Sequence, residues 1–110
     1  MPKGAESKLE KDLRSYMESQ GGFFPKSVSP GNKGWPDRNP SHWVCGPFYM
    51  EVKRPGKEST PLQMEVAREM ASHGYRVYAS VSQFRIGKEI IDDEINGVPA
   101  SKRRHNPVSP

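Results

Sequence analysis

The sequence has few of the features that define several classes of protein. It contains one cysteine, Cys45, so it has no internal disulfide framework. A lone cysteine usually serves as a small, half-buried hydrophobic side chain. No run of about 18 apolar residues could span a bilayer, and the N-terminus lacks the basic-then-apolar pattern of a secretory signal. We therefore expect a soluble, cytoplasmic protein with no membrane partner.

The chain also has little hydrophobic material. It is 110 residues long and 33% of them are hydrophobic, with a mean hydropathy of −0.86. One domain of this size buries only a modest core, so a partner subunit would add buried apolar surface. Lysine and arginine exceed the acids by four, a balance that favours a polyanionic partner without specifying one.

Several motifs of known chemistry are absent. The sequence has no Gly-x-Ser-x-Gly, no Gly-x-x-x-x-Gly-Lys-Ser/Thr and no Gly-x-Gly-x-x-Gly, which excludes the usual hydrolase elbow and the loops that bind a nucleotide cofactor. His42 and Cys45 have a spacing suggestive of zinc ligands, but no second His/Cys pair follows them. Zinc is therefore a poor fit.

Residues 6–20 are predicted to form a helix that ends at the Gly21-Gly22 pair. Its buried stripe, at helical spacing, comprises Leu9, Leu13, Tyr16 and Met17. Glu6 and Glu10 lie within or beside that stripe, where carboxylates are costly to bury. Either they fringe the apolar face with their charges in water or near the helix dipole, or they belong to a site.

The next part of the chain is predicted to hold short strands. Residues 23–28 suit an edge strand because Pro25 interrupts them, and residues 29–41 are rich in turn residues. Residues 43–45 and 48–54 form two strands around Gly46-Pro47. On the longer one, two faces alternate: Phe48, Met50 and Val52 against Tyr49, Glu51 and Lys53.

This alternation places Glu51 and Lys53 on one strand face. Residues two apart on a strand rise by roughly 6.6 Å, so one side chain can hold a cation while the other holds a water or an anionic group. The alternative is a solvent-exposed face with an incidental ion pair, which is the commoner explanation of an isolated Glu-x-Lys triplet.

A second helix is predicted to start at Pro61, with Thr60 as its cap, and to stop near Gly74. Its buried stripe comprises Leu62, Val66, Ala67 and Met70. Gln63 lies in its first turn, at the edge of that stripe, where an ordinary polar residue is also common.

The last third is predicted to contain a strand, a helix and a tail. Residues 75–81 alternate as a half-buried strand, with Val77 and Tyr78 on opposite faces. Ser82 caps a helix over residues 83–95. Residues 97–110 carry three basic residues in a row and three prolines, so we expect a disordered tail that either contacts phosphates or only aids solubility.

The polar residues singled out above form a set that suits a hard divalent cation. Asp37 follows a proline turn, Glu51 and Lys53 share a strand face, Gln63 starts a helix and a glutamate lies on the first helix. Mg²⁺ or Mn²⁺ prefers carboxylate, carbonyl and water oxygens and keeps several waters. We therefore predict a metal site within the stretch from residue 34 to residue 63.

The same stretch carries a family resemblance. In order, the motifs are Glu6-Ser7-Lys8-Leu9-Glu10, Gly21-Gly22, Lys26, Ser29-Pro30-Gly31, Gly34-Trp35-Pro36-Asp37-Arg38, Glu51-Val52-Lys53-Arg54-Pro55-Gly56, Pro61-Leu62-Gln63 and Gly74. This order resembles the VRR-NUC domain, the virus-type replication-repair nuclease of the PD-(D/E)xK nuclease superfamily. No single motif is specific to this family, but the ordered set of motifs from about residue 6 to residue 84 is specific to it.

The resemblance implies a fold and an activity. The fold is α/β, a restriction-endonuclease-like core in which helices flank a small mixed β-sheet, here over residues 1–96 with residues 97–110 as the tail. The activity is Mg²⁺-dependent hydrolysis of DNA phosphodiester bonds, in which Mn²⁺ is expected to substitute. A viral member would act in the host cytoplasm.

The resemblance also implies roles for individual residues. Asp37, Glu51 and the Val52 carbonyl would bind the metal. Lys53 would orient or help deprotonate the attacking water, and Gln63 would position Lys53 or a metal-bound water. The first-helix carboxylate would complete the outer metal shell, and Glu10 is preferred to Glu6 because the family's glutamate follows an aliphatic residue. The expected DNA contacts are Lys26, Lys33, Arg38 and Arg54.

Short stand-alone members of this family are associated with branched DNA such as four-way (Holliday) junctions. A homodimer would match the two-fold symmetry of a junction and would cover aromatic residues expected to be exposed, namely Phe23, Phe24, Trp35, Trp43 and Phe48. The alternatives are a nicking, flap or linear-duplex endonuclease and a basic nucleic-acid-binding module without catalysis. Because Asp37, Glu51, Lys53 and Gln63 are all intact, the catalytic reading is preferred.

Overall fold

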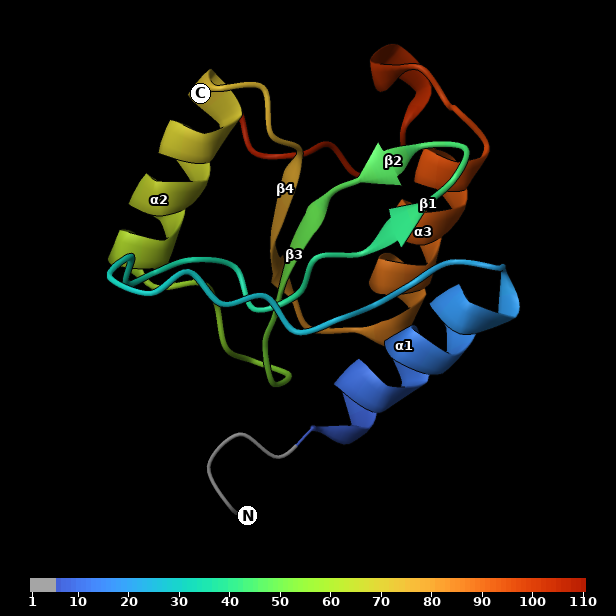
Figure 1. Cartoon of the computed structure of the whole chain (residues 1–110), viewed down its shortest axis with the longest axis horizontal. Coiled ribbons are helices and arrows are strands. Elements are labelled where there is room, and N and C mark those ends of the chain that lie inside the picture. The colour runs from blue at the N-terminus through green and yellow to red at the C-terminus, as the bar shows by residue number, and fades with distance from the viewer. Residues whose placement is uncertain (1–5) are drawn as a thin grey trace.

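The computed structural model describes residues 6–110, in which helices cover both sides of a parallel strand pair (Figure 1). The strands are β3 (Tyr49–Val52) and β4 (Val77–Val81). Helices α1 (Lys8–Ser19) and α3 (Phe84–Ile95) lie on one side, and α2 (Pro61–Ser72) lies on the other. A larger core cluster fills the α1 and α3 side, and a smaller one lies beneath α2.

A second strand pair and single bridges extend this sheet. Strands β1 (Ser41–His42) and β2 (Gly46–Pro47) form an antiparallel hairpin. Arg38 forms antiparallel bridges to Met50 of β3 and to Lys26. Because β3 is parallel to β4 and antiparallel to the Arg38 segment, the pairing is mixed, which confirms the expected α/β fold with helices flanking a small mixed sheet.

Two of the expected strands are corrected by the structure. Residues 23–28 form no strand but only single bridges at Phe23 and Lys26, because Pro25 between them has no N–H to donate. Residues 43–45 are the turn of the hairpin and Gly46-Pro47 belongs to β2, the reverse of the expectation. Trp43 is 88% exposed at that turn.

The second helix begins as expected, whereas the first begins at Lys8, two residues later than expected. The Ser7 hydroxyl accepts a hydrogen bond from the Glu10 N–H, and Leu13 and Met17 are buried on α1. Thr60 caps α2, which buries Ala67 and Met70. The expected burial of Leu62 is wrong, because this residue lies exposed in the first turn of α2.

Helix α3 differs from the prediction at its start. Its packing against α1 also gives a reason for the glycine in its interior. Gln83 occupies the N-cap without a side-chain hydrogen bond, so the expected capping by Ser82 is wrong. Gly87 lies against α1, where a Cβ atom would come 2.5 Å from Leu13 Cδ2. The glycine therefore lets the two helices approach closely.

Strand β4 is buried on both faces. Val77 and Tyr78 are both buried although they point in opposite directions, because helices cover the sheet on both sides. The expected half-buried alternation is therefore wrong. The Tyr78 hydroxyl donates to Glu94 on α3 at 2.6 Å.

The C-terminal segment is ordered, contrary to the expected disorder. It contains a 3₁₀ turn, η1 (Ala100–Lys102), after which Arg103 pairs with Glu94 at 2.7 Å. Arg104 pairs with Asp93 at 2.7 Å, and the Val108 N–H donates to the Val77 carbonyl at 2.8 Å. Arg103 and Arg104 thus pair with acidic side chains of α3, partners that local composition does not reveal.

The aromatic residues divide between core and surface. Phe24 and Phe48 are buried, so their expected exposure is wrong, and Trp35 is half-buried. Phe23 and Trp43 are exposed as expected. Among residues 6–110, no helix combines the length and apolar character needed to cross a membrane.

Candidate active site

The turn that carries Asp37 is held between α2 and β3. Gly34 has a φ of +85°, and a Cβ atom there would come 3.1 Å from the Leu62 carbonyl oxygen at the start of α2. Glycine is thus required both by its backbone conformation and by the close approach. The Trp35 indole N–H donates to the Ser27 hydroxyl at 2.8 Å, and its ring packs perpendicular to Tyr49 of β3.

Asp37 is hydrogen-bonded both to Glu51 and to the residue that follows it, Val52. The Asp37 N–H donates to Glu51 Oε2 at 3.0 Å, and the Val52 N–H donates to Asp37 Oδ1 at 3.0 Å. The antiparallel pairing of Arg38 with Met50 sets this register and places the two carboxylates side by side.

Lys53 and Gln63 reach the same carboxylate. Lys53 Nζ lies 3.6 Å from Glu51 Oε1, and Gln63 Nε2 donates to that oxygen at 2.9 Å. The Gln63 side-chain oxygen accepts from the Thr60 N–H at 2.8 Å, so the residue both completes the capping box of α2 and holds Glu51. The structure therefore brings together Asp37, Glu51, Lys53 and Gln63.

Burial sets the electrostatics of the two acids. Removal from water raises the pKa of Asp37 to about 6, and the Glu10 charge adds to the increase while the Val52 N–H opposes it. Removal from water also raises the pKa of Glu51 to about 7, with a further increase from Asp37 and a decrease from Lys53. A cation bound between these two acids would favour their ionised form and so lower both pKa values.

The donor set fits a hard cation better than a zinc ion. Among residues 6–110, no group of three or more His, Cys, Asp or Glu side chains is arranged to hold a metal. Magnesium needs no such cage, because one or two carboxylates, completed by water and substrate phosphate, are enough. Asp37 and Glu51 provide this pair, each with lone pairs beyond those used in the hydrogen bonds above.

Comparison with known proteins decides the family. No protein-family model matches the chain. Over 78 residues it is 35% identical to "Putative nuclease p44" of Acyrthosiphon pisum secondary endosymbiont phage 1, a match that covers 71% of this chain and 84% of the relative. A solved VRR_NUC domain superposes with a TM-score of 0.70 over 79% of this chain and 94% of that chain, at 23% identity. The chain belongs to the VRR-NUC family of nucleases.

The first-helix glutamates of this VRR-NUC domain form a network around Arg38. Glu10 Oε2 accepts from Arg38 at 2.8 Å, and its Oε1 accepts from the Ser7 N–H at 3.3 Å. Glu6 pairs with Arg38 at 3.0 Å and with Arg14. Of the two, Glu10 lines the same hollow as Lys53, of about 430 Å³.

Arg38 is therefore not the exposed DNA contact that the sequence predicts. Its side chain is 2% exposed, and its guanidinium donates to Glu6, Glu10 and the Phe24 carbonyl. A phosphate has no access to this group. The short-range sequence places Arg38 in a polar turn and gives no indication of acidic partners about 30 residues away.

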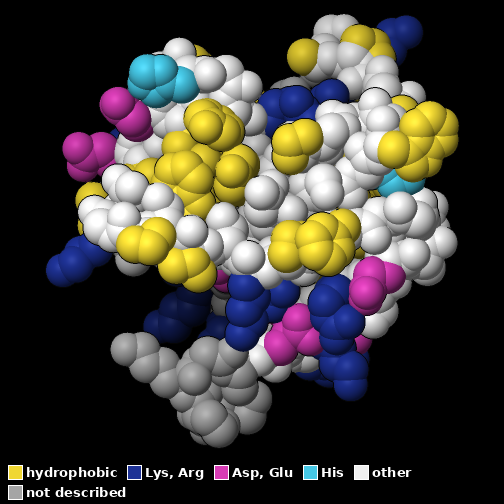
Figure 2. All heavy atoms as spheres, in the orientation of Figure 1, with side chains coloured by type: hydrophobic (Ala, Val, Ile, Leu, Met, Phe, Trp, Pro, Cys, Tyr) yellow, Lys and Arg dark blue, Asp and Glu magenta, His cyan; other side chains and the backbone are white. Residues whose placement is uncertain are grey.

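The other expected cations of the VRR-NUC domain are at the surface. Lys26 is exposed and bridges to Arg38 beside the Asp37 turn, and Lys33 and Arg54 are also exposed. Lys57, which sequence reasoning missed, lines the hollow with Lys53 and Arg54. Its position in the turn directly after the Glu-x-Lys strand could have indicated it. In Figure 2, Lys and Arg side chains gather around the N-terminal part of α1 and the turn before α2.

Proposed function

We propose that this protein is a Mg²⁺-dependent endonuclease that hydrolyses DNA phosphodiester bonds, with Mn²⁺ able to substitute. The observation that carries the proposal is the convergence of Asp37, Lys53 and Gln63 on the Glu51 carboxylate. A VRR-NUC fold and a nuclease relative from a phage support it. The phage relative also supports action in the cytoplasm of a host cell.

The roles follow from the chemistry of the side chains. Asp37, Glu51 and the Val52 carbonyl would hold the metal, which would supply a charge sink for the phosphate oxygens and make a water more acidic. Lys53, whose ammonium lies beside Glu51, orients the attacking water and offsets charge that develops on the phosphate. Gln63 fixes the Glu51 oxygen that faces Lys53.

The outer residues assist without binding the metal directly. Arg38 holds Glu10 in place. Burial is the main cause of the raised pKa of Asp37, and the nearby charge of Glu10 raises it further. Glu10 would complete the outer shell of a bound metal. Lys26, Lys33, Arg54 and Lys57, which are exposed cations, contact DNA phosphates and account for salt-dependent binding.

The preferred substrate is branched DNA, with four-way junctions as the leading case. Nicking, flap or linear-duplex cleavage is the alternative within the same chemistry. A basic binding module without catalysis is disfavoured because it gives no reason for a half-buried Asp37 and a buried Glu51 whose pKa values are both raised.

A metal titration on labelled junction, flap, single-stranded and linear DNA tests the proposal. Cleavage should require Mg²⁺ or Mn²⁺, and Asp37→Asn and Lys53→Ala should each lower kcat by about 100-fold or more. Arg85→Ala, a change at an exposed arginine of α3, is the matched control. Undiminished cleavage by both site variants would show that the site is wrong.

We also propose that the protein acts as a homodimer. The combination of a small core with exposed apolar side chains, of which Trp43 is the most exposed, favours a partner surface, and a two-fold dimer presents two sites to a junction. Light scattering at micromolar concentration should give twice the mass of the chain. A monomer that cleaves junctions at full rate would contradict the dimer.

A further inference from the structure

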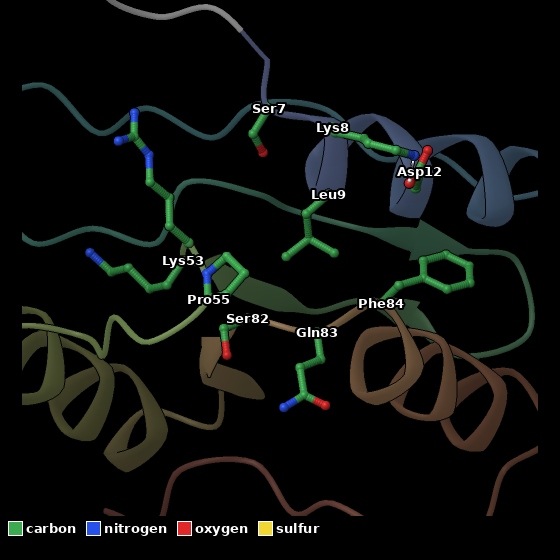
Figure 3. A pocket seen from close by; sticks show the side chains of 10 residues that line it. Ser7, Lys8, Leu9, Asp12, Lys53, Pro55, Ser82, Gln83 and Phe84 are labelled. Carbon is green, nitrogen blue, oxygen red and sulfur yellow. Dashed lines mark hydrogen bonds and ion pairs between the residues drawn. The ribbon is translucent and has the colours of Figure 1, made fainter.

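A second hollow borders the candidate active site. It has a volume of about 490 Å³ and lies between the start of α1, the turn after β3 and the first residues of α3 (Figure 3). This volume lies within the range of about 300–1,000 Å³ that small-molecule sites occupy. None of the roles described above uses its apolar residues.

The interior of this hollow is apolar and its rim is polar. Leu9 points from α1 toward the space between Pro55 and Phe84 (Figure 3). The Phe84 ring is 39% exposed, yet it is held by a perpendicular contact with Tyr16 at 6.1 Å between ring centroids. A fixed, accessible aromatic ring opposite aliphatic side chains is suited to a flat, weakly polar ligand.

The hollow adjoins the one that Glu10 and Lys53 line. Ser7, Lys53 and Arg54 line both of them. In Figure 3 the Lys53 side chain extends on the other side of Pro55 from Leu9 and Phe84. A nucleotide links its base to its phosphate through the sugar, so a phosphate at Lys53 can place its own or the adjacent base in the apolar hollow.

We propose that this hollow receives an unstacked nucleobase of the DNA strand being cut, next to the scissile phosphate. The inference rests on the proposed nuclease function. Base–aromatic stacking tolerates any base, because every base has a π-face. In an intact duplex the base must first be unstacked and unpaired, whereas at a branch, gap or mismatch this cost is smaller. The hollow would thus select distorted DNA.

The test compares variants on two versions of one substrate. The first substrate is a labelled DNA that the wild-type protein cleaves with Mg²⁺, and the second is the same DNA with an abasic nucleotide beside the mapped cut, on either side in turn. Phe84→Ala should lower kcat/KM by roughly tenfold or more on the intact DNA. On one of the two abasic substrates the base that would stack on Phe84 is missing, so Phe84→Ala and wild type should have equal kcat/KM.

Two further variants separate stacking from folding. Phe84→Trp keeps an aromatic face and should retain cleavage of the intact DNA, whereas Phe84→Leu keeps an apolar side chain and should lose it as Phe84→Ala does. Arg85→Ala changes the next residue of α3, which is exposed and does not line the hollow, and should leave cleavage of both substrates unaffected.

The outcomes distinguish the two levels of the proposal. If the wild-type protein cleaves intact DNA and Phe84→Ala cleaves it with the same kcat/KM, the proposed base pocket is wrong but the nuclease function stands. The same conclusion follows if Phe84→Ala loses as much on both abasic substrates as on intact DNA. A wild-type protein that cleaves no DNA would overturn the nuclease function and the base pocket with it.

Discussion

Burial of the two acids of the candidate site couples their protonation to folding. The pKa of Asp37 is about 6 and that of Glu51 about 7 in the folded protein, against ordinary values of 3.8 and 4.5. Between about pH 4 and 7 the folded chain therefore binds more protons at these residues than the unfolded chain does. Their contribution to stability is fully present below about pH 4 and is lost as the pH rises through 7.

We expect the metal-free protein to lose thermal stability between pH 5 and pH 8, and we expect Mg²⁺ or Mn²⁺ to raise Tm more at pH 8 than at pH 5. The reason is that the cation binds the deprotonated carboxylates and competes with protons. Differential scanning calorimetry at the two pH values checks both statements.

The control is the double variant Asp37→Asn, Glu51→Gln, which carries no titrating acid at these positions. Its Tm should fall less over the same pH range and should not respond to the metal. An equal fall in both proteins would assign the pH dependence to other groups.

At the scale of elements, the approach of α1 to α3 depends on Gly87. A helix interior normally disfavours glycine by about 1 kcal/mol relative to alanine, so its presence here has a packing reason. The Cβ atom of an alanine would come 2.5 Å from Leu13 Cδ2, and Leu13 is fully buried and cannot move into solvent.

Gly87→Ala should therefore reduce the free energy of unfolding by about 1–2 kcal/mol, because the overpacking outweighs the gain in helix propensity. In a Leu13→Ala background the clash is absent, so the same substitution should become stabilising. Urea unfolding of the four proteins in this cycle measures the reversal of sign. A stabilising effect of Gly87→Ala in the wild-type background would show that the helices can separate at little cost.

At the scale of the whole molecule, the C-terminal segment is fastened to the sheet. Glu94 is a carboxylate with a side chain only 1% exposed, and it receives hydrogen bonds from Arg76, Tyr78 and Arg103. Arg103 also donates to the Val98 carbonyl and to the Tyr78 hydroxyl. These contacts join β4, α3 and the last residues into one unit.

Arg103→Ala should reduce the free energy of unfolding by about 2 kcal/mol, the usual effect of losing hydrogen bonds to a buried charged group. It should also speed hydrogen exchange at the Val108 N–H, which bonds to the Val77 carbonyl. Arg85→Ala, which removes an exposed ion pair with Glu89, should change stability by less than about 1 kcal/mol. Equal effects of the two substitutions would mean that the C-terminal segment is not fastened by Arg103.

Much of the local structure follows from neighbouring residues. Thr60 caps α2 through the residue three positions ahead, and the alternation along residues 48–54 places Glu51 beside Lys53. Such contacts depend on short spacing, so sequence patterns predict them. The wrong strand assignment around Gly46 shows the limit, because a two-residue strand has no repeat to recognise.

Sequence alone was sufficient for the start of α2, for the strand that carries Glu51 and Lys53, and for the ordered motifs that identify a VRR-NUC domain. Only the tertiary structure decided that Arg38 is buried against the first helix and that the last residues are ordered. It alone showed that Phe84 and Leu9 line one hollow beside the site. The physical reason is that charges and apolar faces are satisfied by partners distant in the chain, and composition shows that a partner is needed without showing where it lies.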